Sequence, residues 1–246
     1  MLFITFVVVQ KHECNHKMIL KTKVNNRKPQ LKTVFVLVLL IFSLTTTFAQ
    51  KKSKVFIERA DAFRFDENIN KDVQRLIGRV IIRQDSTLFY CDSAYLNDQS
   101  NSFEAFDNVH IKVNDTVDVY SDRMLYDGNT RIAELFNNVK LVDKNTTLTT
   151  EHLIYNRINK TAYYDVGGKI VNDENTLNSL IGLYFTTSRT FHFRKDVVLV
   201  TPDQETYSDT LIYNTNTEIA YFVGPTVIRS DENIVYCENG WYDTKN

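Results

Sequence analysis

One acidic residue recurs along the chain at a nearly constant spacing, and this row has the most obvious potential for chemistry. Its members are Asp61, Asp92, Asp122, Glu151, Asp209 and Glu238. Such carboxylates could bind cations or act as general acids and bases. Hydrolysis of a sugar, however, needs two carboxyl groups about 5 to 10 Å apart, and one acid per repeat does not provide that pair. The pattern favours a structural role, with each carboxylate at the start of a strand, in solvent, accepting hydrogen bonds from nearby backbone.

The histidines and cysteines do not form a second constellation. His110, His152 and His192 fall at different offsets within the repeat, which argues against a shared metal site. Cys91 and Cys237 occupy equivalent slots five repeats apart, and strands about 4.8 Å apart would separate them by at least about 24 Å, beyond disulfide reach. We expect two small buried thiols, with pairing between stacked subunits as the alternative. We expect no cofactor, no metal and no catalytic residue, since the chain also lacks a phosphate-binding glycine loop and a G-x-S-x-G motif.

Composition excludes several classes of protein. The chain has 246 residues, with 29 Lys and Arg against 30 Asp and Glu. This balance argues against nucleic acid as a partner. Only 7 Gly and 3 Pro exclude collagen-like chains and Pro/Gly-rich disordered chains. The 13 Tyr and 16 Phe favour strands over helices, because aromatic side chains fit a half-buried pleated surface.

Residues 18–49 have the pattern of a cleaved signal peptide. Basic residues over Lys21–Lys32 precede an apolar run of 11 residues at 34–44, and Thr47-Phe48-Ala49 allows cleavage after Ala49. The run is shorter than the roughly 20 residues of a transmembrane helix, although an uncleaved signal anchor is the alternative. We therefore expect Met18 to be the true start, with residues 1–17 upstream of it. The mature protein would be exported.

The rest of the chain consists of repeats of about 29 residues. Each repeat has a small residue and an acid, then an apolar stretch that ends in Tyr or Leu before Asn or Asp. A second apolar stretch follows about eleven residues after the acid, and after a polar or Gly break the alternation resumes. Clear copies are Ser121–Asp127 with Ala133–Phe136, and Ser208–Asn214 with Ala220–Phe222. The apolar period is two rather than 3.6, which predicts strands.

A repeat this short cannot bury its apolar face alone, so stacked neighbours must cover it. We predict one all-β domain over residues 50–246, an elongated stack whose second strands bend near the middle around a long apolar interior. The last residues, Tyr242–Asn246, follow the first strand of a repeat. We interpret this as either a truncated C-terminus or an open edge strand, which is a template for pairing with another chain.

The repeat resembles that of the OstA-like family, the periplasmic lipopolysaccharide-transport proteins of the LptA type. The clearest carriers are Tyr120–Asp127 and Tyr207–Asn214, in register with further copies over residues 54–246 behind an export signal. The resemblance implies a β-jellyroll shaped like a folded taco, with ~29-residue repeats in two facing sheets. It implies a protein that is not an enzyme and whose interior carries the acyl chains of lipopolysaccharide and its lipid A.

The resemblance also implies partners. Open sheet edges would join the chain to other OstA-fold subunits, inner-membrane LptC-like and outer-membrane LptD-like, or to further copies head to tail. The alternatives are the soluble N-terminal part of an outer-membrane lipopolysaccharide translocon subunit, a β-solenoid carbohydrate-active or adhesive protein, and a structural envelope repeat with a filled core. An outer-membrane-associated location is compatible with the first of these.

A lipid-carrying interior would be lined by inward aromatic and aliphatic side chains. Burying roughly 300 Å² of acyl chain at ~25 cal/mol per Å² is worth several kcal/mol without covalent or metal chemistry. The second strands alternate cleanly, with Glu104, Glu134 and His192 on the opposite face. The candidate lipid-binding residues are Phe103, Tyr126, Leu135, Tyr155, Tyr164, Tyr184, Phe191, Phe193, Tyr213 and Phe222.

Overall fold

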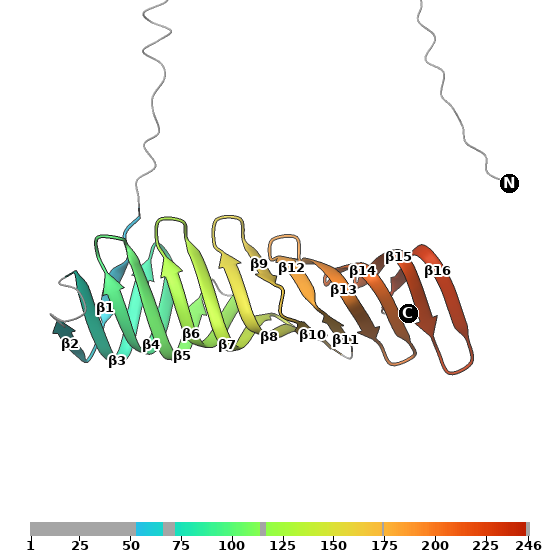
Figure 1. The fold of residues 1–246 in the computed structure, drawn as a ribbon, viewed down its shortest axis with the longest axis horizontal. Helices are drawn as coiled ribbons and strands as arrows, with labels where there is room; N and C mark the ends of the chain where they lie inside the picture. Colours follow the sequence, from blue (N-terminus) through green and yellow to red (C-terminus); the bar gives the residue numbers. More distant parts are fainter. Residues whose placement is uncertain (1–52, 66–71, 114–116, 174, 245–246) are drawn as a thin grey trace, which may run out of the picture. The chain divides into compact units, whose positions relative to one another are not determined.

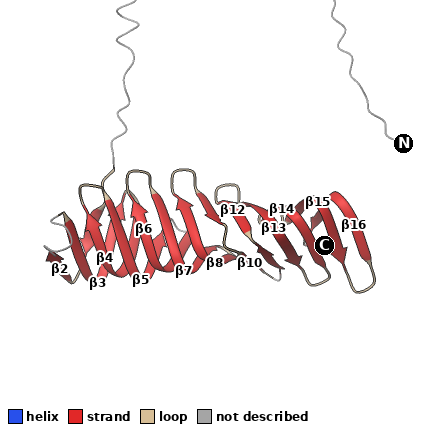
Figure 2. Cartoon of the chain, in the orientation of Figure 1, coloured by secondary structure: helices blue, strands red, loops and turns tan. Residues whose placement is uncertain are grey.

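The computed structural model describes residues 53–65, 72–113, 117–173 and 175–244. The expected signal peptide and the segment before it lie outside the described residues. All the regular secondary structure in these ranges is β-strand (Figure 2). The described residues contain no helix long and apolar enough to cross a membrane. The strands are β1 (Phe56–Arg59), β2 (Ala62–Phe65), β3 (Val73–Gln84), β4 (Thr87–Asn97), β5 (Ser102–Lys112), β6 (Val117–Asp127), β7 (Ile132–Asp143), β8 (Thr146–Asn156), β9 (Thr161–Tyr164), β10 (Gly168–Asn172), β11 (Asn175–Ser179), β12 (Ile181–Phe185), β13 (Thr190–Val200), β14 (Glu205–Asn214), β15 (Ile219–Arg229) and β16 (Ile234–Asp243).

The 16 strands of the described residues form a single hydrogen-bonded sheet. Neighbours are antiparallel and follow chain order, so the colours in Figure 1 run in sequence along the sheet. β1 and β2 both pair with β3. Two of the long strands are each interrupted and appear as two short strands: β9 and β10 form one, and β11 and β12 form the other. β9 pairs with β12, and β10 pairs with β11.

The strands that open successive repeats are regularly spaced. β4, β6, β8, β11, β14 and β16 begin at residues 87, 117, 146, 175, 205 and 234, which lie 29 or 30 residues apart. A return strand precedes the start of each next repeat, as β5 does between β4 and β6. Equivalent residues therefore stand in columns across the sheet.

Each long strand bends near its middle. The register between β5 and β6 shifts between Phe106 and Val109. The two intervening residues, Asp107 and Asn108, have φ values of 59° and 50°, a left-handed conformation that Asn and Asp adopt more readily than other side chains. The same pair of positive φ angles occurs at Asn137-Asn138 in β7 and Lys195-Asp196 in β13. Because the bends stand in one column, they fold the sheet along a line.

The fold line divides the sheet into two leaves. Leaf A comprises residues 80–91, 109–113, 117–121, 139–150, 168–173, 175–179, 197–208 and 226–237, and leaf B comprises 73–77, 93–106, 123–136, 152–164, 181–194, 210–223 and 239–243. Phe89 of leaf A packs against Phe103 and Tyr126 of leaf B, with ring centroids 5.2 and 4.5 Å apart. The leaves therefore face each other, and the two facing sheets expected for a β-jellyroll are halves of one folded sheet.

The small residue and the acid of the sequence motif lie at the bend rather than at the start of a strand, so that expectation was wrong. The Ser121 hydroxyl donates to the carbonyl of Arg123, 3.1 Å away across the bend residue Asp122. Ser208 donates in the same way to the carbonyl of Thr210, at 3.0 Å. Four of the exposed acids accept bonds from a neighbouring bend: Asp61 from Arg79, Asp92 from Asn108, and Asp122 and Glu151 from Asn138. The acids of this row therefore hold neighbouring bends together along the fold line.

Candidate functional site

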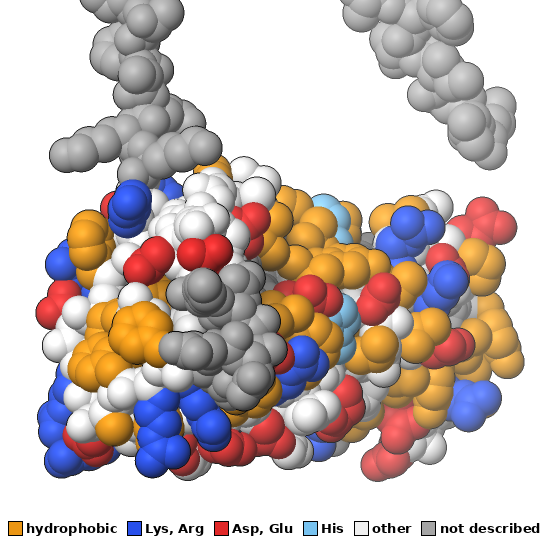
Figure 3. All heavy atoms as spheres, turned by 60° about the vertical axis from the view of Figure 1, so that its left-hand side comes forward, with side chains coloured by type: hydrophobic (Ala, Val, Ile, Leu, Met, Phe, Trp, Pro, Cys, Tyr) orange, Lys and Arg blue, Asp and Glu red, His pale blue; other side chains and the backbone are white. Residues whose placement is uncertain are grey.

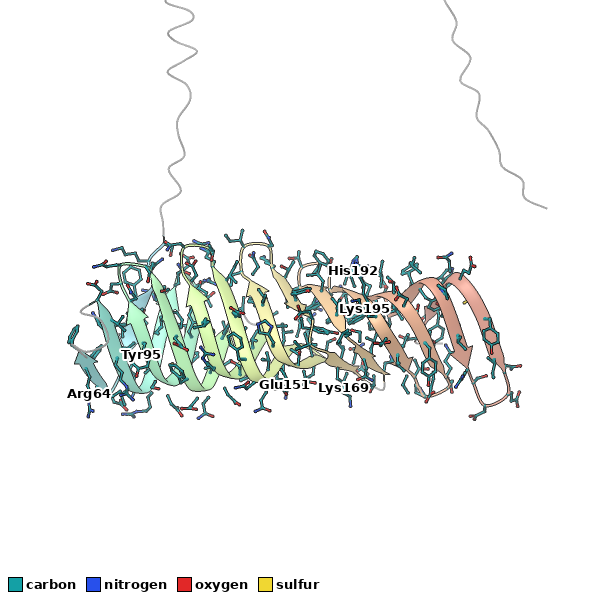
Figure 4. All side chains as sticks on the ribbon, viewed as in Figure 1. Arg64, Tyr95, Glu151, Lys169, His192 and Lys195 are labelled. Atoms are coloured by element: carbon teal, nitrogen blue, oxygen red, sulfur yellow. The ribbon has the colours of Figure 1, made fainter. Side chains whose placement is uncertain are left out.

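The side chains predicted to point inward all lie in the space between the leaves. Each is at most 3% exposed, and all belong to leaf B. They are Phe103, Tyr126, Leu135, Tyr155, Tyr164, Tyr184, Phe191, Phe193, Tyr213 and Phe222. Polar residues of the same strands, such as His192, point away from this interior (Figure 4).

Leaf A supplies the other wall of the interior, which the sequence reasoning did not assign. Its buried side chains are smaller and mostly β-branched or aliphatic. They include Val80, Ile82, Val109, Ile111, Val119, Val139, Leu141, Leu148, Ile170, Leu177, Val197 and Leu199. The alternation after each polar break, as in Val109-His110-Ile111, is the signal that could have identified this wall.

The interior is filled by the protein's own side chains. Tyr184, Phe191 and Phe193 form a stack with successive ring centroids 3.9 and 5.3 Å apart. The ring of Tyr164 lies over Gly182, where an added Cβ would come within 2.3 Å of a ring carbon. Close packing of this kind means that any guest must displace side chains.

The two leaves also meet at their hairpin tips, along a line that we call the mouth. Here tyrosine hydroxyls of leaf B reach polar side chains of leaf A. The bonds are Tyr184 to Asp143 at 2.7 Å, Asn172 to Tyr213 at 3.1 Å, Tyr242 to Thr201 at 3.3 Å, and Tyr126 to Gln84. The mouth is therefore closed by polar contacts, whereas the interior behind it is apolar.

One contact of the mouth contains a buried ion pair. The Asp143 side chain is 1% exposed and accepts from both the Tyr184 hydroxyl and the Arg189 guanidinium, the latter at 3.2 Å. Burial raises the pKa of Tyr184, and donation to the Asp143 carboxylate raises this pKa further. The hydroxyl therefore stays protonated at neutral pH and can only remain a donor to Asp143.

A second cation lies at the mouth nearer β3. The Arg157 guanidinium donates to Gln84 Oε1 at 2.9 Å and to the hydroxyls of Tyr126 and Thr87. It also lies 5.6 Å from the ring centroid of Phe89, a distance at which cation–π attraction operates. Arg157 thus links one tip of leaf B to the tip between β3 and β4.

Two acids that line a groove on the outer surface are paired with bases. A groove of about 820 Å³ over β4–β7 is lined in part by Tyr95, Glu104 and Glu134. Glu104 pairs with Arg123 at 2.6 Å and Glu134 with His152 at 2.9 Å. Charged and hydrophobic side chains are interspersed on the face seen in Figure 3. No group of three metal-ligating side chains occurs among the described residues.

The two cysteines in the described ranges are free. Cys91 is buried at the fold line, where desolvation raises the pKa of its thiol to about 12. A thiol that is neutral at ordinary pH is a poor nucleophile. Cys91 therefore serves as a small packing residue.

These features define a class of protein, the β-jellyroll made from one antiparallel sheet folded over a continuous apolar interior. Residues 52–209 match the OstA-like protein family. Because this match covers more than half of the chain, the protein belongs to the OstA-like family.

Comparison with solved structures gives remote likenesses. No curated protein matches this chain. A solved structure that matches is that of LptH, the LptA-homologous periplasmic component of the lipopolysaccharide transport device from Pseudomonas aeruginosa. It is 13% identical, covers 69% of this chain and 81% of its own, and has a TM-score of 0.21.

Proposed function

We propose that this protein is a non-catalytic periplasmic carrier in lipopolysaccharide transport and outer-membrane assembly. Its membership of the OstA-like family supports this proposal, since the family comprises proteins of this transport system. The observation that carries the proposal is the interior itself. Buried apolar side chains occur on every strand from β3, with Leu76, to β15, with Phe222, so an apolar path runs along the whole stack.

The binding mode can be argued from the packing. Burial contributes roughly 0.8 kcal/mol per CH₂, so an acyl chain of about twelve carbons gains roughly 10 kcal/mol on leaving water. This gain must offset the cost of parting the leaves and displacing their contacts. In our proposal the inward residues of leaf B, among them Tyr164, Phe191 and Phe193, exchange contacts with leaf A for contacts with the lipid.

The edge strands are the proposed docking points for neighbours in a bridge. On β16, Tyr236 is 75% and Trp241 is 67% exposed, while Phe65 on β2 at the opposite end is 67% exposed. An edge strand offers unpaired backbone groups to a further strand. We propose that OstA-fold subunits anchored to the inner and outer membranes, or further copies of this chain, add to these edges. The alternative, a soluble domain of an outer-membrane translocon subunit, would use the same interior.

Export is part of the proposal. Cleavage after Ala49 by a signal peptidase would release the β-domain into the periplasm. N-terminal sequencing of the protein from an envelope fraction tests this, with Gln50 as the expected first residue. A first residue before Lys21 would contradict cleavage.

Two adjacent residues provide a matched test of lipid binding. Phe222 points inward and is 3% exposed, whereas Tyr221 points outward and is 45% exposed. Each is replaced in turn by the photocrosslinking amino acid p-benzoylphenylalanine, and cells are irradiated. We expect a lipopolysaccharide adduct at position 222 and none at 221. Equal labelling at both positions, or none at 222 in correctly folded protein, would contradict the proposal.

A further inference from the structure

The tyrosines at the mouth form a column with the period of the repeat. Tyr126, Tyr155, Tyr184, Tyr213 and Tyr242 are each 29 residues apart. In the four cases where a bond to leaf A is seen, the partner lies 41 or 42 residues earlier in the chain. These partners are Gln84, Asp143, Asn172 and Thr201.

The chemistry of this column differs from that of the interior. Apolar contacts between the leaves stop contributing to the stability of the fold when their surfaces are exposed to water. A hydrogen bond at the mouth instead exchanges its partner for water, so its net contribution is small and reversible. A row of such bonds can therefore open and reclose without leaving polar groups unsatisfied.

The contacts from the middle of the stack toward β16 are not equal in strength. Tyr184 and Arg189 converge on the buried Asp143 carboxylate, and hydrogen bonds to an ionised group are about twice as strong as neutral ones. The next two contacts are neutral and longer, at 3.1 Å for Asn172 with Tyr213 and 3.3 Å for Tyr242 with Thr201. Of these three contacts, the one at Asp143 is therefore the strongest.

We propose that the mouth is where an acyl chain inserts sideways between the leaves, and that Tyr184, Asp143 and Arg189 form the latch that limits its rate. This inference rests on the proposed function. The occupant is a long acyl chain, because buried side chains such as Leu148 and Phe191 give the space behind the latch an apolar lining. With lateral insertion, the lipid does not have to enter through either end of the stack.

The experiment compares two Tyr→Phe variants. Tyr184→Phe removes the hydroxyl that donates to Asp143, whereas Tyr207→Phe removes an exposed hydroxyl that makes a similar bond of 2.6 Å to Glu205 on the outer face. The exported protein is mixed with pyrene-labelled dodecanoic acid in stopped flow. Loss of a charge-assisted bond predicts about tenfold faster insertion for Tyr184→Phe, and no change for Tyr207→Phe. Arg189→Gln serves as a second latch variant.

Hydrogen exchange of the same proteins without lipid separates the possible failures. We expect faster exchange in the hairpin tips 143–146 and 185–190 for Tyr184→Phe alone. Equal insertion rates in all proteins would overturn the latch while leaving the carrier function standing. Faster tip exchange without binding of the probe by any protein would overturn the proposed function, and with it the latch as a lipid gate.

Discussion

Asn138 and Asp122 join the bends of two neighbouring strands. The side-chain Nδ2 of Asn138 donates to the Asp122 carboxylate at 2.7 Å. The side chain of Asn108 donates to Asp92 in the same way, also at 2.7 Å, and in both pairs the residues are 16 positions apart. The donor residues have φ values of 52° and 50°. One residue thus provides both the left-handed backbone and the bond that aligns the fold line.

This relationship predicts an ordered mutation series at Asn138. Asn138→Gly keeps the backbone conformation and loses only the bond, so we expect a loss of about 1 kcal/mol or less in the free energy of unfolding. Asn138→Val adds the strain of a β-branched residue at positive φ, for which we expect a further 1–3 kcal/mol or so. Urea denaturation checks the order. Equal stability of the two variants would mean that the bend does not depend on this conformation.

The contact between Gly182 and Tyr164 predicts that even one added methyl group is costly. An alanine Cβ at position 182 would lie 2.3 Å from the Tyr164 ring, so Gly182→Ala should lower the free energy of unfolding by roughly 1–3 kcal/mol. Combining it with Tyr164→Leu removes the clash, and the two changes should therefore be non-additive. Simple additivity in a double-mutant cycle would refute this explanation.

Removing Asp143 should destabilise the protein more than removing an acid on the outer face. Asp143→Ala removes the carboxylate that pairs with the largely buried Arg189 and accepts from the Tyr184 hydroxyl, and we expect a cost of about 3 kcal/mol. Asp118 pairs with His110 at 2.7 Å on a more exposed surface, so Asp118→Ala should cost about 1 kcal/mol or less. Thermal unfolding of both variants provides the comparison, and the reverse order would contradict the role given to Asp143.

Buried thiol and phenol groups predict that the folded state loses stability at alkaline pH. Burial raises the pKa of the Cys91 thiol and of the Tyr164 hydroxyl to about 12 each, and it raises the pKa of Tyr126 and Tyr155 as well. Groups whose pKa is raised on folding contribute stability that is complete below their unfolded pKa and is lost as the pH rises toward the folded value.

The urea midpoint should therefore be constant up to about pH 8 and fall from about pH 9 upward, as the free energy of unfolding decreases by up to ~1.4 kcal/mol per pH unit for each group. Tyr164→Phe should make this decline shallower. A midpoint that stays constant to pH 11 would show that these side chains reach solvent in the folded state.

The wall contributed by leaf B could be predicted from the sequence because its residues are large and alternate with charged ones. Phe103 and Leu135, for example, stand beside Glu104 and Glu134, and period-two alternation is a reliable sign of a half-buried strand. The prediction was less accurate for the first strand of each repeat, whose start was placed at the small residue and the acid. A small residue followed by an acid is typical of a turn, yet Ser121 and Asp122 form a bend within β6.

The closure of the mouth was not predictable from periodicity. The tyrosines recur every 29 residues, but their partners are Gln84, Asp143, Asn172 and Thr201. These side chains share the ability to hydrogen-bond and little else. A contact between residues 41 or 42 positions apart becomes apparent only when the sheet is seen to fold.

The central claim is that the space between the leaves carries lipopolysaccharide acyl chains, and native mass spectrometry of the mature protein from an envelope fraction tests it most directly. We predict a population carrying the added mass of lipopolysaccharide, and binding of lipid A by the stripped protein. If the protein is purified without lipid and also does not bind added lipid A, the interior is a permanently filled core, and the carrier function is contradicted.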